Sequence, residues 1–180
     1  MMPKRKDTLT GGTGDVNPQI LTITATQTAA DTTTIIQQPL PIPRYPTAKG
    51  RNLVMEFLWV DYYDIIATTT AANTTQLITI TTNPTAFANS LTAIQDARLL
   101  DAWWRVVTFA TAVGFLEKPV ERYQDLTDAN GHGILVAADN LYVGTYSTGT
   151  TYANSAVIKL AYRWKEVSLE EYIGIVQSQQ

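Results

Sequence analysis

The residues that could carry out chemistry are few, and the single histidine is the first to consider. His132 lies between Gly131 and Gly133, in a segment with the composition of a turn. Any Ser-His-Asp arrangement would have to use it. The chain contains no cysteine and no nucleophile elbow. We therefore interpret His132 as a turn residue and expect no enzymatic activity.

Carboxylates gather at two places where a hard cation could bind. Asp61 and Asp64 close a long apolar run, and Asp125 and Asp128 share a loop with Asn130. Ca²⁺ takes several oxygen ligands from flexible loops. Asp125 and Asp128 are therefore candidate Ca²⁺ ligands at subunit contacts, with a solvated turn as the alternative. No other cofactor is expected.

Basic residues form two groups that could contact phosphates, one at the N-terminus and one around a proline-rich bend. A flexible cationic tail releases counterions without a fixed geometry. A solubilising terminus or a fragment of a nuclear-targeting signal would also explain the first group, and residues that flank a strand would explain the second. The candidate nucleic-acid contacts are Lys4, Arg5, Lys6, Arg44, Lys49 and Arg51.

The composition limits the class of protein. A length of 180 residues suits one domain with a sizeable core. Charged residues make up only 16% of the chain, against about 25% in typical soluble domains. Such a low fraction of charged residues suits a protein that buries much of its surface against copies of itself. A threonine-rich polar surface would also explain it. The net charge of −3 argues against a dedicated nucleic-acid-binding domain.

Short β-branched and aromatic runs separated by glycine and proline predict the elements that position these residues. We expect an all-β fold, an eight-stranded antiparallel jelly-roll sandwich with a short N-terminal arm. The arm covers 1–18 and the sandwich domain 19–180. Asp139-Asn140 is expected to form a hairpin turn, and 83–100 and 117–131 are expected to be long connections, the first with a short helix over 86–95. The predicted strands are 20–26, 33–38, 52–63, 74–82, 101–113, 134–138, 141–146 and 153–167.

Two aromatic or apolar segments are candidates for subunit contacts. Trp103 and Trp104 are adjacent, so in a strand they point to opposite faces and one leaves the core. That tryptophan lies at an interface, where the residue is enriched, or under a loop. Ser168-x-x-Glu171 is a capping box that predicts a short helix. Its apolar residues, Tyr172 and Ile173 among them, require cover from their own domain or from a neighbouring subunit.

The C-terminal third carries a family resemblance. The pattern Arg163-x-x-x-Val167-Ser168-Leu169-x-Glu171-Tyr172-Ile173-Gly174, preceded by Asp125-Leu126-Thr127-Asp128 and Gly131-His132-Gly133, resembles the ends of capsid proteins from small circular Rep-encoding single-stranded DNA viruses. The resemblance implies a single jelly roll that self-assembles into a closed icosahedral shell of ~60 copies or a multiple. It also implies a nucleic-acid genome inside, a place in the virion, assembly inside the host cell and no membrane partner. The basic arm here is shorter than such subunits often carry.

A β-sandwich carbohydrate-binding or receptor-binding module is the alternative function. Threonine, tyrosine and asparagine side chains in loops such as 146–154 would suit contacts to sugars. The two hypotheses differ in oligomeric state, because a module stays small and a shell protein reaches megadalton size.

Overall fold

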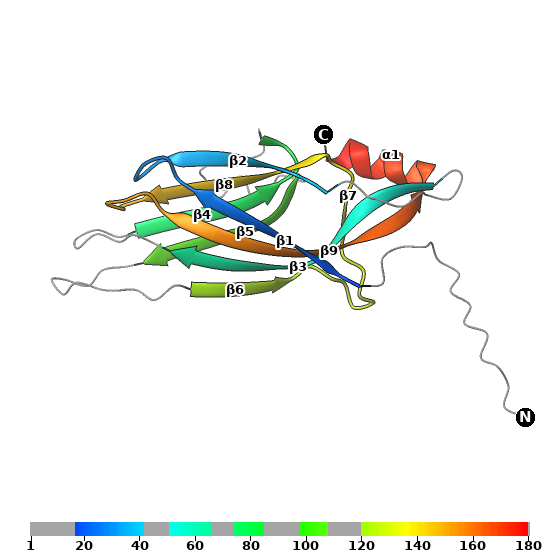
Figure 1. Ribbon diagram of the computed structural model, residues 1–180, viewed down its shortest axis with the longest axis horizontal. Coiled ribbons are helices and arrows are strands. Elements are labelled where there is room, and N and C mark those ends of the chain that lie inside the picture. The colour runs from blue at the N-terminus through cyan, green and yellow to red at the C-terminus, as the bar shows by residue number, and fades with distance from the viewer. Residues whose placement is uncertain (1–16, 42–50, 66–73, 85–97, 108–119, 180) are drawn as a thin grey trace, which may run out of the picture.

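The computed structural model describes residues 17–41, 51–65, 74–84, 98–107 and 120–179. Within them the chain forms nine strands and one helix (Figure 1). The elements are β1 (Gln19–Thr26), β2 (Thr33–Pro39), β3 (Arg51–Ile65), β4 (Thr74–Thr81), β5 (Leu99–Val107), β6 (Val120–Asp125), β7 (Ile134–Val136), β8 (Asn140–Thr148), β9 (Ser155–Ser168) and α1 (Leu169–Ser178).

The strands form two antiparallel sheets that face each other. Sheet A is five-stranded, with the order β1-β9-β3-β6 and with β7 also pairing with β3. Sheet B is four-stranded, with the order β2-β8-β4-β5. Most strands consecutive in the sequence thus lie in different sheets or are separated by other strands, as in a jelly roll. The predicted fold class is confirmed.

The ninth strand arises because one strand of the jelly roll is interrupted. β6 and β7 both pair with β3, with Asp125 opposite Trp59 and Ile134 opposite Phe57. Between them residues 126–133 leave the sheet as a loop, at the point where the register between β3 and β9 shifts. The predicted connection over 117–131 was therefore wrong for β6, and the described residues form nine strands instead of eight.

The predicted hairpin at Asp139-Asn140 was also wrong. β7 belongs to sheet A, whereas β8 pairs with β2 and β4 in sheet B. The chain therefore crosses between the sheets at this point. The backbone N–H of Leu40 donates to the carbonyl oxygen of Asp139 at 2.9 Å, which ties the crossing to the end of β2. The helix expected over 86–95 lies outside the described residues.

The core lies between the sheets and follows the alternation of the long strands. In β9, Ile158, Leu160, Tyr162 and Trp164 are buried in it. β3 is buried continuously from Val54 to Phe57, so this part is covered on both faces. The core is therefore rich in aromatic side chains.

Polar side chains hold the turns at one end of the sandwich. Oε1 of Gln27, just after β1, accepts hydrogen bonds from Ser147 Oγ at 2.9 Å and from the N–H of Asn154 at 3.1 Å. Asp31 Oδ1 accepts from the N–H of Thr150 at 2.8 Å. The two turns that join β1 to β2 and β8 to β9 are thereby fixed to each other.

The C-terminal helix forms where the capping box predicted it. The Ser168 side chain accepts a hydrogen bond from the N–H of Glu171 at 3.2 Å and starts α1. At its end, the Gln179 side-chain amide accepts from the N–H of Ala137 at 3.0 Å and donates to the carbonyl of Leu135 at 2.7 Å. Through these two hydrogen bonds, the side-chain amide of Gln179 takes the place of a neighbouring strand beside β7. No helix in the described part of the chain could cross a bilayer.

Candidate functional site

The most strongly organised polar cluster lies on the outer face of sheet A. Glu56 in β3 is opposite Arg163 in β9 and next to Lys165 on the same face. The Glu56 side chain is fully buried (0% exposed), and its carboxylate accepts from Arg163 Nε and lies 3.5 Å from Lys165 Nζ. The N–H of Gly133 donates to it at 3.0 Å. Two cations and one backbone donor thus satisfy one buried carboxylate.

This environment keeps Glu56 ionised. Burial alone raises the pKa of the carboxyl group. The hydrogen bonds from Arg163 and Gly133 and the charge of Lys165 outweigh burial and hold the pKa of Glu56 below its ordinary value. A fully paired carboxylate that is ionised near neutral pH is suited to fixing structure.

The cluster holds the loop that interrupts the β6–β7 strand, which we name the clamped loop (residues 126–133). Arg163 Nη2 also donates to the carbonyl of Gly131 at 3.2 Å. A Cβ atom on Gly133 would lie 2.0 Å from the carbonyl oxygen of Phe57, so only glycine fits there. The loop therefore lies against β3 at a fixed distance.

His132 is part of this loop, and its backbone N–H and its ring both contact Asp128. Its N–H donates to Asp128 Oδ1 at 2.9 Å, and its Nδ1 lies 3.3 Å from Asp128 Oδ2. The backbone bond from His132 contributes most to holding the pKa of Asp128 below its ordinary value. Both the backbone and the ring of His132 thus serve the turn, which agrees with its interpretation as a turn residue.

The two candidate Ca²⁺ ligands, Asp125 and Asp128, each accept hydrogen bonds from residues of their own turn. Asp125 Oδ1 accepts from the N–H and the Oγ1 of Thr127 at 2.9 and 2.8 Å. Asp128 accepts from the N–H groups of Asn130 and His132. No group of three or more metal-ligating side chains occurs among the described residues. Ca²⁺ binding by Asp125 and Asp128 stays a prediction.

Of the six candidate nucleic-acid contacts, the structure places one. Arg51 is exposed at the start of β3. The other five lie outside the described residues, as does most of the arm that was predicted over 1–18. A role for this group in binding the genome stays a prediction.

The adjacent tryptophans point to opposite faces of β5, as predicted. Trp103 is 8% exposed and packs in the core, where its ring centroid lies 5.8 Å from that of Tyr62. Trp104 is half-buried on the outer face of sheet B, where Val106, also on that face, is 54% exposed. Trp104 is therefore the one of the pair that could contact another subunit.

The two C-terminal candidates for subunit contacts differ in their surroundings. Tyr172 is half-buried and lines a pocket of its own domain, whereas Ile173 is 46% exposed on α1. The helix is thus covered in part by its own sandwich, and its exposed side remains a candidate contact.

Sequence reasoning missed a group of aromatic side chains on the outer face of sheet A, which we name the aromatic face (Trp59, Tyr63 and Tyr123). The ring centroids of Trp59 and Tyr123 lie 5.7 Å apart. Tyr123 is 61% exposed and Tyr63 38% exposed. Tyr123 was missed because it lies in a segment for which the sequence predicts a connection. Glu56 was missed although a lone carboxylate inside a long apolar run is a recognisable signal.

Comparisons with known proteins place the fold. No family model matches the chain, and no curated protein sequence is similar to it. Among solved structures, VP1 of Merkel cell polyomavirus in complex with GD1a oligosaccharide is 10% identical, has a TM-score of 0.51, and is matched over 89% of this chain and 99% of that chain. VP1 of trichodysplasia spinulosa-associated polyomavirus in complex with GM1 oligosaccharide is 9% identical, with a TM-score of 0.52, over 88% and 98%.

A third similar structure is the VP1 pentamer of human polyomavirus 6. It is 12% identical, with a TM-score of 0.50, over 83% of this chain and 95% of that chain. The three neighbours are jelly-roll capsid proteins and not enzymes. At such low identity the likeness establishes the shared jelly-roll fold.

Proposed function

We propose that this protein is a virus capsid subunit whose activity is self-assembly into a closed shell. The observation that carries the proposal is the jelly-roll likeness to VP1 capsid proteins, which spans 89% of this chain and 99% of a neighbour. The match covers most of this chain, and proteins with this fold are the shell subunits in these neighbours. The protein has a structural role in the virion and catalyses no reaction.

The surface of the sandwich supports association with further copies. Apolar side chains are exposed on the outer faces of both sheets, with Ile20 at 51% on sheet A and Ile35 at 42% and Val106 at 54% on sheet B. Charged residues make up only 16% of the chain. Interfaces between subunits are depleted in charge at their centres and enriched in aromatic residues. The VP1 neighbour from human polyomavirus 6 is a pentamer, and we propose a homo-oligomeric shell of ~60 copies or a multiple for this chain.

The shell encloses a single-stranded DNA genome in this proposal, because the C-terminal pattern resembles that of capsid proteins from single-stranded DNA viruses. The pattern residues serve the fold in specific ways. Arg163 binds Glu56, Val167 is 1% exposed, and Ser168 caps α1. Lys4, Arg5 and Lys6 on the arm contact the phosphates in this proposal.

Sedimentation velocity of the purified full chain tests the assembly proposal. We expect a species of megadalton mass whose absorbance ratio at 260 and 280 nm exceeds that of the protein alone, because nucleic acid sediments with it. Replacing Lys4, Arg5 and Lys6 by alanine lowers the nucleic-acid content and leaves the particle mass of the shell unchanged. A single species of one to three chains at high concentration contradicts the capsid proposal.

The aromatic face supports receptor-glycan binding as a second candidate function. Trp59, Tyr63 and Tyr123 present rings near Asp61 and Lys159, which can accept from and donate to hydroxyl groups. Two of the VP1 neighbours are solved with GD1a and GM1 oligosaccharides. Binding of these two oligosaccharides to wild type, and its loss in Tyr123→Ala, would support the candidate, and equal signals from both proteins would reject it.

A further inference from the structure

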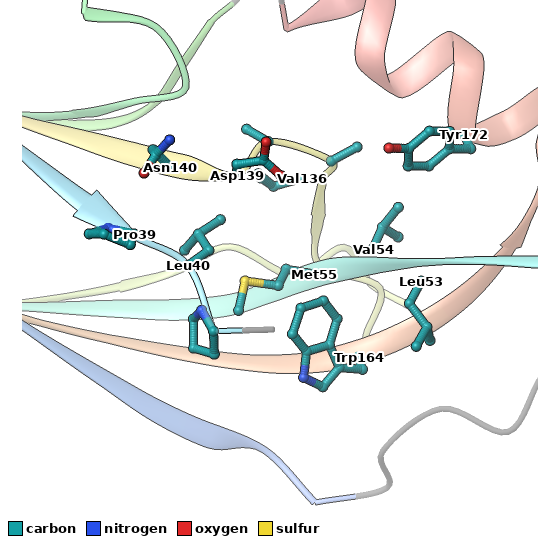
Figure 2. Close-up of a pocket in the computed structure, with 13 residues that line it drawn as sticks. Pro39, Leu40, Leu53, Val54, Met55, Val136, Asp139, Asn140, Trp164 and Tyr172 are labelled. Carbon is teal, nitrogen blue, oxygen red and sulfur yellow. The ribbon is translucent and has the colours of Figure 1, made fainter. Parts of the chain in front are cut away.

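A pocket of about 410 Å³ opens at the end of the sandwich where α1 lies (Figure 2). It is formed where the end of β2, the start of β3, β7 and the crossing to β8 meet, with Tyr172 of α1 at one side (Figures 1 and 2). The volume lies within the range of about 300–1,000 Å³ that is typical of small-molecule sites. The pocket therefore has room for a ligand and not only for one or two waters.

Apolar side chains make up most of the pocket wall. Leu40, Met55, Val136 and Trp164 also belong to the hydrophobic core or pack against it. Figure 2 shows these side chains around an open space. The wall is thus suited to a hydrocarbon chain.

Asp139, Asn140 and Tyr172 bring polar groups to one side of the pocket (Figure 2). Asp139 and Asn140 come from the crossing between the sheets, and the hydroxyl group of Tyr172 points toward the same space (Figure 2). Asp139 is exposed, and its carboxylate has no hydrogen-bond or ion-pair partner within the part of the chain that the structure describes. A negative charge at the mouth of an apolar pocket attracts a cation and repels a carboxylate.

We propose that this pocket binds a single-chain aliphatic amine, with the hydrocarbon against Leu40 and Trp164 and the ammonium group at Asp139. The fit combines apolar burial with charge complementarity at one end. This site is separate from the aromatic face.

Titration calorimetry below the aggregation concentration of the amphiphiles tests the inference, with dodecylamine and dodecanoate as probes. Wild-type protein should bind dodecylamine saturably, and dodecanoate at least about tenfold more weakly. Asp139→Asn should weaken the binding of dodecylamine about tenfold and reduce the difference between the two probes. Glu170→Gln removes an exposed carboxylate of α1 that does not line the pocket and should bind as wild type does.

A second variant tests the apolar part of the site. Ala138 lines the pocket and is half-buried, so Ala138→Phe should block both probes. Absence of saturable dodecylamine binding to wild type, equal affinity for dodecanoate, or binding that neither Asp139→Asn nor Ala138→Phe changes would each overturn the proposal. Asp139→Asn should form the same particles as wild type, so a failure of ligand binding and a failure of assembly are separate results.

Discussion

Glu56 sets the position of the clamped loop. A buried carboxylate lowers stability unless it is paired, and removing one partner of such a cluster leaves the other charges uncompensated. Here Arg163 and Lys165 are about one third exposed, with side-chain exposures of 31% and 35%. Water therefore screens part of the interaction, and the effect of removing the carboxylate is smaller than for a fully buried pair.

Glu56→Gln should lower the free energy of unfolding by about 2 kcal/mol. Glutamine keeps the shape and the acceptor for Gly133 but leaves Arg163 and Lys165 without their counter-charge. Urea unfolding of the unassembled protein measures the change, with Asp61→Asn on the same sheet face as control. A loss below about 0.5 kcal/mol, the usual size for surface substitutions, would contradict the clamp.

The pH dependence of stability should report the same group. The folded-state pKa of Glu56 lies below its ordinary value of 4.5. The stabilisation is therefore fully present above that value and is lost as the pH falls through the folded-state pKa. The difference in unfolding free energy between wild type and Glu56→Gln should stay constant from about pH 7 to about pH 5 and shrink below pH 4.5. A difference that grows on acidification would be the opposite of this expectation.

At the scale of elements, the clamped loop divides one strand of the jelly roll into β6 and β7. Gly133 is the residue that allows the chain to return to the sheet, because its Cα lies against the backbone of Phe57. Any side chain there must push the loop away from β3. The loop and its anchor on β3 and β9 thus act as one unit.

Gly133→Ala should destabilise the fold by more than about 2 kcal/mol, since a methyl group 2.0 Å from a carbonyl oxygen forces the backbone apart. Gly174→Ala is the matched control. That glycine lies in α1, and a methyl group added to it would have nothing within 4 Å, so alanine there should stabilise by up to about 1 kcal/mol. Thermal unfolding of the two variants checks the contrast, and equal melting temperatures would contradict it.

Local sequence patterns predicted individual strands and the helix, but they did not predict which strands pair with each other. The strand over 153–167 and the Ser168 cap follow from local features, and both were confirmed. β6 was missed because Glu121, Arg122 and Gln124 interrupt its apolar pattern at the edge of a sheet. The turn composition of Asp139-Asn140 does not state which sheet the next strand joins, since pairing depends on tertiary contacts. The clamped loop requires residues far apart in the sequence to meet, and no local pattern encodes that.

At the scale of the whole molecule, the fold and its apolar outer faces are the features that favour assembly. A shell needs both a stable sandwich and a complementary outer surface. Trp103 serves the first requirement, since it lies in the core, and Trp104 serves the second, since it lies on the outer face of sheet B. Substitutions at the two positions should therefore fail in different ways.

Trp103→Ala should lower the free energy of unfolding by about 3–5 kcal/mol through loss of core packing. Trp104→Ser should change it by about 1 kcal/mol or less and should still reduce the yield of assembled particles at least about tenfold, in line with the role of tryptophan at interfaces. Circular dichroism and light scattering on the same samples separate folding from assembly. Normal assembly of Trp104→Ser would exclude this residue from the interface.

The central claim is that copies of this chain close into a symmetric shell. Negative-stain electron microscopy of the purified full chain tests it most directly. We expect uniform closed particles of about 15–25 nm, the size that results when tens of subunits meet through standard interfaces. A field of monodisperse particles no larger than a few chains, under conditions in which the protein is folded, would contradict it.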